Sequence, residues 1–186
     1  MPWLILVTGH PASGKTTLAD ALARDLNVVV LHRDAFKESL FDTLGSGSLE
    51  ESKSYGRASW ALLHLAAQAV MARGLPLILE ANYSITPGRA ELAGFLERYG
   101  YDVMELVLDA PAAVLATRYQ RRIREGLRHP GHHDDEQLME QTLKMTEPYQ
   151  PLRLGGAFRM IDTSQPTTHY YPALVDDLRA LVDAGA

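Results

Sequence analysis

The strongest chemical signal in the sequence is a glycine-rich octapeptide close to its start. Residues 9–16 read Gly-His-Pro-Ala-Ser-Gly-Lys-Thr, which fits the phosphate-binding pattern G-x-x-x-x-G-K-[ST]. The glycines let the backbone turn so that consecutive N–H groups point at phosphate oxygens. Lys15 can reach the β- and γ-phosphates, and the Thr16 hydroxyl can coordinate Mg²⁺. We predict that a nucleoside triphosphate binds to Gly9, His10, Pro11, Ala12, Ser13, Gly14, Lys15, Thr16 and Thr17.

The segments on either side of this octapeptide have the character that a phosphate loop needs. Leu4 to Val7 is a continuous apolar run, as expected of a parallel strand covered on both faces, and Thr16 to Asp25 carries apolar residues at helical spacing. The alternative is an ordinary glycine turn between a strand and a helix. A buried strand before the loop and a helix after it are the context that favours phosphate binding.

An acidic residue closes one of the predicted apolar strands. Glu80 follows Leu77-Ile78-Leu79, where a carboxylate has little packing reason to be. It has to be hydrated or paired, and a metal–phosphate site would supply the pairing; the alternative is a strand end that emerges into solvent. Asp109, after the next predicted strand, is a rival for this role, but Ala110-Pro111 behind it fits a helix cap better.

Arginines are concentrated in one short stretch of a chain whose formal net charge is −5. Five of them lie within eleven residues, namely Arg118, Arg121, Arg122, Arg124 and Arg128. On a helix from Ala112 to about Arg124, Arg118 and Arg122 lie one turn apart on the same face. Guanidinium groups suit phosphoryl binding because they donate bidentate hydrogen bonds and stay charged. The alternative is a solvated basic helix, the usual explanation of a charge run.

Residues 128–135, Arg-His-Pro-Gly-His-His-Asp-Asp, have the composition of a metal cluster but not its spacing. Adjacent His132 and His133 rarely point at one ion, and the spacing matches no zinc template. We interpret the segment as an outer loop near a second substrate. The sequence assigns no chemical role to it.

Strands and helices alternate along the chain, and their order predicts how these residues are positioned. Strands are expected at residues 4–7, 28–31, 77–79, 103–108 and 158–161, and helices at about 16–25, 35–44, 60–73, 88–99, 112–124, 136–145 and 173–182. This order predicts an α/β fold in which a parallel five-stranded sheet has helices on both faces. We expect one domain over residues 1–186.

Composition excludes several classes of protein. The chain has no cysteine, which excludes disulfides, thiolate metal sites and cysteine nucleophiles. We find neither a bilayer-length apolar segment nor a signal peptide, so we expect a cytoplasmic protein without membrane partners. The net charge argues against non-specific binding along a nucleic-acid backbone, although a short oligonucleotide end remains compatible with a locally basic site.

The motifs and the order of elements resemble the small P-loop kinases, a group that includes polynucleotide 5′-hydroxyl kinases, chloramphenicol phosphotransferase and gluconate kinase. The resemblance covers nearly the whole chain, but only the phosphate loop is strongly specific. It implies the three-layer P-loop NTPase fold of the nucleoside-monophosphate-kinase type, with a helical lid at about residues 116–135.

The resemblance also implies roles for polar residues. Similar kinases carry an acid at the position of Asp34, which orients the acceptor hydroxyl and takes its proton. His32-Arg33-Asp34 resembles the N-R-D segment of polynucleotide kinases, with His32 in place of asparagine. Glu80 and Asn82 match an E-x-N segment whose acid helps to hold Mg²⁺ and whose amide contacts substrate or phosphate. The alternative for Asp34 is a cap for a helix that begins at Ala35.

The implied activity is an ATP-dependent phosphotransferase that uses ATP and Mg²⁺. Arg118 and Arg122 would close over the transferring phosphoryl group as lid arginines, and Thr163 and Ser164 would lie near the base of ATP. The acceptor is a hydroxyl of a small molecule or of a 5′-hydroxyl nucleic-acid end, contacted by Arg33, Asp34 and Asn82, while Thr16 and Glu80 hold the metal. The alternative is a nucleotide-dependent regulatory ATPase or switch without an acceptor.

Overall fold

The computed structural model describes residues 1–45, 47–83, 88–132 and 147–184, and its elements alternate as predicted. The strands are β1 (Trp3–Gly9), β2 (Val29–His32), β3 (Leu77–Glu80), β4 (Asp102–Asp109) and β5 (Ala157–Asp162). The helices are α1 (Lys15–Leu26), α2 (Arg33–Leu44), α3 (Leu49–Met71), α4 (Gly88–Tyr99), α5 (Ala112–Arg124) and α7 (Tyr171–Ala184), with short 3-10 turns η1 (Pro130–His132) and η2 (Thr167–His169). The helix expected at residues 136–145 lies outside the described residues.

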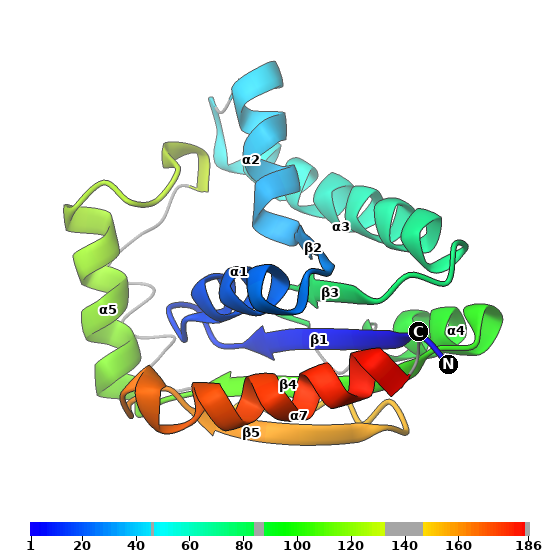
Figure 1. Ribbon diagram of the computed structural model, residues 1–186. Coiled ribbons are helices and arrows are strands. Elements are labelled where there is room, and N and C mark those ends of the chain that lie inside the picture. The colour runs from blue at the N-terminus through cyan, green and yellow to red at the C-terminus, as the bar shows by residue number, and fades with distance from the viewer. Residues whose placement is uncertain (46, 84–87, 133–146, 185–186) are drawn as a thin grey trace.

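The five strands form one parallel sheet in the order β2-β3-β1-β4-β5, which confirms the predicted α/β fold (Figure 1). Because the strands are parallel, their carboxyl ends share one edge of the sheet. That edge carries Gly9, His32, Glu80, Asp109 and Asp162, the last residues of the five strands. In open α/β sheets this edge is where ligands bind.

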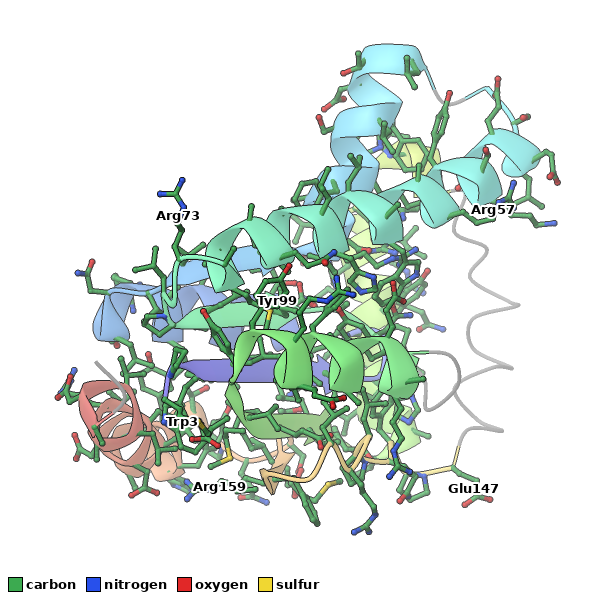
Figure 2. The ribbon with its side chains drawn as sticks, turned by 90° about the vertical axis from the view of Figure 1, so that its right-hand side faces the viewer. Trp3, Arg57, Arg73, Tyr99, Glu147 and Arg159 are labelled. Atoms are coloured by element: carbon green, nitrogen blue, oxygen red, sulfur yellow. The ribbon has the colours of Figure 1, made fainter. Side chains whose placement is uncertain are left out.

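Helices cover both faces of the sheet and create two apolar cores. On one face, Ile5 and Val7 of β1 pack with residues of α1 and α7. On the other, Leu4 and Leu6 pack with residues of α3 and α4, which lie side by side over the sheet in Figure 2. This two-sided burial explains why the strands are continuous apolar runs in the sequence. Among the helices of the described ranges, none is both long and apolar enough to cross a bilayer.

One buried carboxylate interrupts the apolar pattern of β4. Glu105 is fully buried, and its carboxylate accepts hydrogen bonds from the backbone N–H groups of Leu152 (2.6 Å) and Leu154 (2.8 Å). A buried charge needs such partners, and these ones are 47 and 49 residues away in the sequence. Glu105 therefore holds the segment before β5 against the sheet.

The predicted role of Asp109 as a helix cap is wrong. The N-cap of α5 is Pro111, so the proline stands at the cap and not in the first turn, and the cap makes no side-chain hydrogen bond. The carboxylate of Asp109 instead accepts hydrogen bonds from the N–H groups of Ala110 (2.8 Å) and Tyr149 (3.2 Å). Asp109 thus fixes the chain that enters β5.

Candidate active site

The phosphate loop joins β1 to α1 at the carboxyl edge of the sheet. Gly9 has φ 148°, and a Cβ at this position would lie 2.1 Å from the carbonyl oxygen of Leu108 on the neighbouring strand. Glycine is therefore required where the loop leaves the sheet. α1 begins at Lys15, and the N–H groups of its first turn have no acceptor within the helix. Such a helix start binds anions through these N–H groups and through its dipole.

Lys15 lies inside the loop. Its Nζ donates a hydrogen bond to the carbonyl oxygen of His10 at 2.8 Å. Burial lowers the pKa of Lys15, and the nearby cations Arg122 and Arg128 lower it further, against the opposing effect of Glu80 and Asp34. A bound phosphate would favour the charged form of this lysine.

Glu80, Thr16 and His32 meet beside the loop. Glu80 is 4% exposed, which excludes a strand end that emerges into solvent. Its Oε2 accepts a hydrogen bond from the Thr16 hydroxyl (3.4 Å) and lies 3.0 Å from Nδ1 of His32, whose Nε2 lies 2.9 Å from Asp20. The hydrogen bond to Glu80 raises the pKa of His32, although burial opposes this.

The same group of residues fits a Mg²⁺ ion. The Thr16 hydroxyl and the Glu80 carboxylate are hard oxygen ligands, the type that Mg²⁺ prefers. The Ser13 hydroxyl next to them in the loop is buried without a hydrogen-bond partner in the described part of the chain. Polar atoms of this kind are usually satisfied in a native protein, so the loop has donor capacity for a ligand.

Arg33 and Asn82, just beyond the ends of β2 and β3, contact each other. Arg33 donates from Nη1 to Oδ1 of Asn82 (3.4 Å) and from Nη2 to the carbonyl oxygen of Gly56 (3.2 Å). Its Cζ lies 4.7 Å from the centre of the Trp60 ring, a cation–π contact. Trp60 thus packs partly against the core and partly under this arginine.

Asp34 lies in the first turn of α2 and does not cap the helix. α2 begins at Arg33, two residues earlier than predicted, and its N-cap is His32. Oδ2 of Asp34 accepts a hydrogen bond from Nη1 of Arg128 at 3.1 Å, and Oδ1 lies 3.6 Å from Arg33. Burial by itself would raise the pKa of Asp34, but Arg128, His132 and Arg33 together lower it. The side chain is therefore a carboxylate at neutral pH.

The two predicted lid arginines, one turn apart on α5, have different neighbours in the structure. Arg118 donates from Nη1 to Oγ1 of Thr163 (3.0 Å) and from Nη2 to the Thr163 carbonyl oxygen (2.6 Å). Arg122 is close enough to Lys15 to lower the pKa of that lysine. The structure thus joins Arg118 to the loop predicted to hold the base, and Arg122 to the phosphate loop.

Most of the predicted residues line one cleft of about 950 Å³. Its lining includes Pro11, Ala12, Ser13, Gly14, Lys15, Thr16, Thr17, Arg33, Asp34, Glu80, Asn82, Arg118, Arg122 and Thr163. Gly9, His10 and Ser164 are not part of this lining. His10 turns to the other side of the loop, where its Nε2 lies 3.0 Å from the carbonyl oxygen of Glu147 and its ring packs edge-on against Tyr149.

Several further residues of this lining had no chemical role assigned from the sequence, among them Lys37, Arg128 and His132. Lys37 could have been found, because residues i and i+3 of a helix lie on one face and it stands three residues after Asp34. Arg128 and His132 lie in the segment that we interpreted as an outer loop near a second substrate, but the sequence could not show their contacts with α2, which join residues far apart in the chain.

Comparisons with known proteins agree with this geometry. Residues 4–148 match the model of the AAA domain family. A presumed kinase from Chloroflexus aurantiacus J-10-fl is 35% identical, with a TM-score of 0.91 over 96% of this chain and 97% of that chain. This confirms the resemblance to small P-loop kinases.

More distant structures share the fold alone. A sugar kinase from Janibacter sp. HTCC2649 is 22% identical with a TM-score of 0.61, covering 100% of this chain and 98% of that chain. A gluconokinase from Sinorhizobium meliloti 1021 is 19% identical with a TM-score of 0.57, covering 98% and 95%. No curated protein matches the sequence significantly. The chain belongs to the AAA domain family, and its fold is that of the small P-loop kinases.

Proposed function

We propose that this protein is an ATP-dependent phosphotransferase that moves the γ-phosphoryl group of ATP to a hydroxyl group of a second substrate. One observation carries the proposal: the carboxylate of Asp34 and the phosphate loop line the same cleft, and Asp34 lies close enough to Lys15 to influence its pKa. A phosphate loop alone could serve many functions. A carboxylate beside it gives a hydroxyl nucleophile a place to bind.

The donor substrate would occupy the phosphate-loop end of the cleft. The N–H groups of residues 9–17 would bind the triphosphate, while Lys15 and Arg122 offset negative charge at the γ-phosphoryl group. Arg118, held on Thr163, would shape the site of the base together with Ser164. Mg²⁺ at Thr16 and Glu80 would neutralise charge on the β- and γ-phosphates.

The acceptor would bind beside Asp34, with Arg33 and Asn82 as further contacts. The carboxylate accepts the hydroxyl proton as the acceptor oxygen bonds to the γ-phosphorus and the bond from phosphorus to the ADP oxygen breaks. Residues from about 116 to 135 would form a lid over this site. Exclusion of water by such a lid suppresses futile hydrolysis.

The test is ATP consumption by the purified protein with a panel of acceptors: a 5′-hydroxyl oligonucleotide, nucleosides, sugars and aminoglycosides. We expect one class to stimulate turnover, and we expect this stimulation to be lost in Lys15→Ala and in Asp34→Asn. Glu97→Gln, on the exposed surface of α4, is the matched control and should behave as the wild-type protein.

Two readouts separate the remaining alternatives. Asp34→Asn should keep its affinity for ATP, because the residue contacts the acceptor and not the triphosphate. Hydrolysis that no acceptor stimulates, lost in Lys15→Ala but unchanged in Asp34→Asn, would contradict the proposal and favour a nucleotide-dependent switch. If the oligonucleotide is the acceptor, its binding should weaken steeply in a salt series, which a small neutral acceptor would not show.

A further inference from the structure

Residues 128–132, Arg-His-Pro-Gly-His, dock on α2, and we name this segment the clasp. In Figure 1 the chain runs from the end of α5 across to α2. Asp34, Glu38 and Asp42 of α2 are spaced four residues apart, so they lie on one face of the helix. Each pairs with one clasp side chain: Arg128 with Asp34 (3.1 Å), His132 with Glu38 (3.0 Å) and His129 with Asp42 (3.1 Å).

The aromatic ring of Phe41 on α2 packs against the clasp between these pairs. Phe41 is 3% exposed, and its ring stacks on His129 with centres 5.2 Å apart and meets His132 edge-on at 5.4 Å. Gly131 lies directly against this ring, because a Cβ at position 131 would be 2.5–2.8 Å from Phe41 ring atoms. Glycine is therefore the residue that lets the clasp approach α2 this closely.

Arg128 gives the clasp a positive charge that does not depend on pH, since a guanidinium group is not deprotonated in proteins. The N–H of Gly131 donates to Nδ1 of His129 (3.0 Å), which leaves Nε2 to carry the proton that His129 donates to Asp42. Burial lowers the pKa of His132 and the nearby Arg128 lowers it further, while the hydrogen bond to Glu38 and the charge of Asp34 oppose this.

We propose that the clasp positions Asp34 and that Arg128 is the positioning residue. Because the clasp docks on α2, the guanidinium of Arg128 is held against the Asp34 carboxylate. This contact orients the carboxylate at the acceptor end of the cleft and stabilises its negative charge. This inference rests on the proposed function, in which Asp34 receives the acceptor proton. The other charged or titratable groups that face Asp34 are His132 of the clasp, Arg33 on its own helix and Lys15 on α1. Arg128 makes the shorter contact with the carboxylate, 3.1 Å against 3.6 Å for Arg33.

The clasp also links two helices of the site. It follows α5 directly, with Arg128 four residues beyond the last residue of that helix. The helix that carries Arg118 and Arg122 is thereby tied to the helix that carries Asp34. A substitution that displaces the clasp should therefore change the surroundings of the Asp34 carboxylate without any change in the phosphate loop.

The test measures Asp34 itself, without ATP or an acceptor. The chemical shift of the Asp34 carboxyl carbon is followed by NMR through a pH titration of protein labelled with ¹³C in aspartate, and Asp34→Asn identifies the signal. We expect Arg128→Met to raise the titration midpoint, because a cation that favours the carboxylate is lost. Arg128→Lys should raise it less, and Arg124→Met, an exposed residue at the end of α5, should not change it.

A second variant keeps every charged side chain and tests whether the docking of the clasp on α2 affects Asp34. Gly131→Ala should displace the clasp from Phe41 and raise the Asp34 midpoint although every charged group is retained. Phe41→Leu in the same chain makes room for the new methyl group and should restore the midpoint at least in part. A wild-type midpoint in Arg128→Met overturns the proposal, and so does a wild-type midpoint in Gly131→Ala. Both outcomes are independent of the proposed function, since the titration requires no phosphoryl transfer.

Discussion

The donor end and the acceptor end of the cleft are built in different ways. The phosphate-binding part of the donor end is one contiguous stretch, residues 9–17, in which glycines, a lysine and a helix start create the site by local backbone geometry. The acceptor end is assembled from the start of α2, the middle of α3, the end of β3 and the clasp. A site within one segment can be recognised from the spacing of its residues in the sequence. A site built from separate elements can be recognised only from the tertiary structure that brings them together.

The charges at the two ends differ as well. Lys15 of the donor end donates to a neutral carbonyl group and has a lowered pKa because it is buried. Arg33 and Arg128 of the acceptor end already bind an amide and a carboxylate. The acceptor end therefore has its arginines hydrogen-bonded to other side chains before any substrate binds, whereas Lys15 donates to a backbone carbonyl group.

The largest effect is expected at Lys15. Lys15→Ala should lower the turnover of ATP by about 10²–10³-fold, the loss typical of one transition-state contact. Because its ammonium is buried beside a neutral acceptor, the substitution should not lower the melting temperature in the absence of ATP. Steady-state kinetics and calorimetry measure the two effects, with exposed Lys53→Ala as the control. A large loss of stability would show that Lys15 is structural and would remove the contrast between the two ends.

Substitutions of Arg118 and Arg122 should affect different constants, ATP affinity for Arg118 and kcat for Arg122. We expect Arg122→Met to lower kcat by about 10²-fold with little change in ATP affinity, because it acts near the transferring group. Arg118→Met should instead weaken ATP binding about tenfold, the equivalent of ~1.5 kcal/mol, because the loop at Thr163 loses its anchor. Kinetics and nucleotide titration with Arg124→Met as control distinguish them. Equal losses in kcat for both variants would support a joint role over the phosphoryl group.

His32 should make stability depend on pH. The pKa of His32 is raised above its ordinary value of 6.5, mainly by its hydrogen bond to Glu80. Its contribution to stability is therefore complete below pH 6.5 and is lost as the pH rises through the folded pKa. His32→Asn, the residue of the polynucleotide-kinase segment, should cost about 1.5–3 kcal/mol below pH 6.5 and less in alkaline solution. Urea unfolding across pH measures this, with exposed His169→Asn as control. A constant difference would contradict it.

The smallest effect is expected at Arg33. Arg33→Lys keeps the charge but loses the planar group that spans Asn82, Gly56 and Trp60. We expect the KM for the acceptor to rise about fivefold, equivalent to ~1 kcal/mol, with ATP affinity unchanged. A change in ATP affinity instead would mean that the two ends are not separate.

Most element boundaries in the described residues agree with the sequence prediction to within about two residues. α3 is the exception, since it begins at Leu49 and not at Trp60. The first half of α3 is polar and contains Gly56, so we did not predict a helix there. Ser48 caps the helix by accepting a hydrogen bond from the N–H of Glu51. The cap with an acid three residues later is a capping box, a signal that was available in the sequence.

From the sequence alone we could predict the phosphate loop, the alternation of strands and helices and the acid that closes β3. These features depend on neighbours within one or two turns, where residue spacing fixes geometry. Three pairings could be seen only in the folded chain: Arg128 with Asp34, 94 residues apart, Arg118 with Thr163, 45 residues apart, and Glu105 with the chain before β5. Each of these pairings joins polar groups from separate elements, and the packing of those elements determines which charges meet.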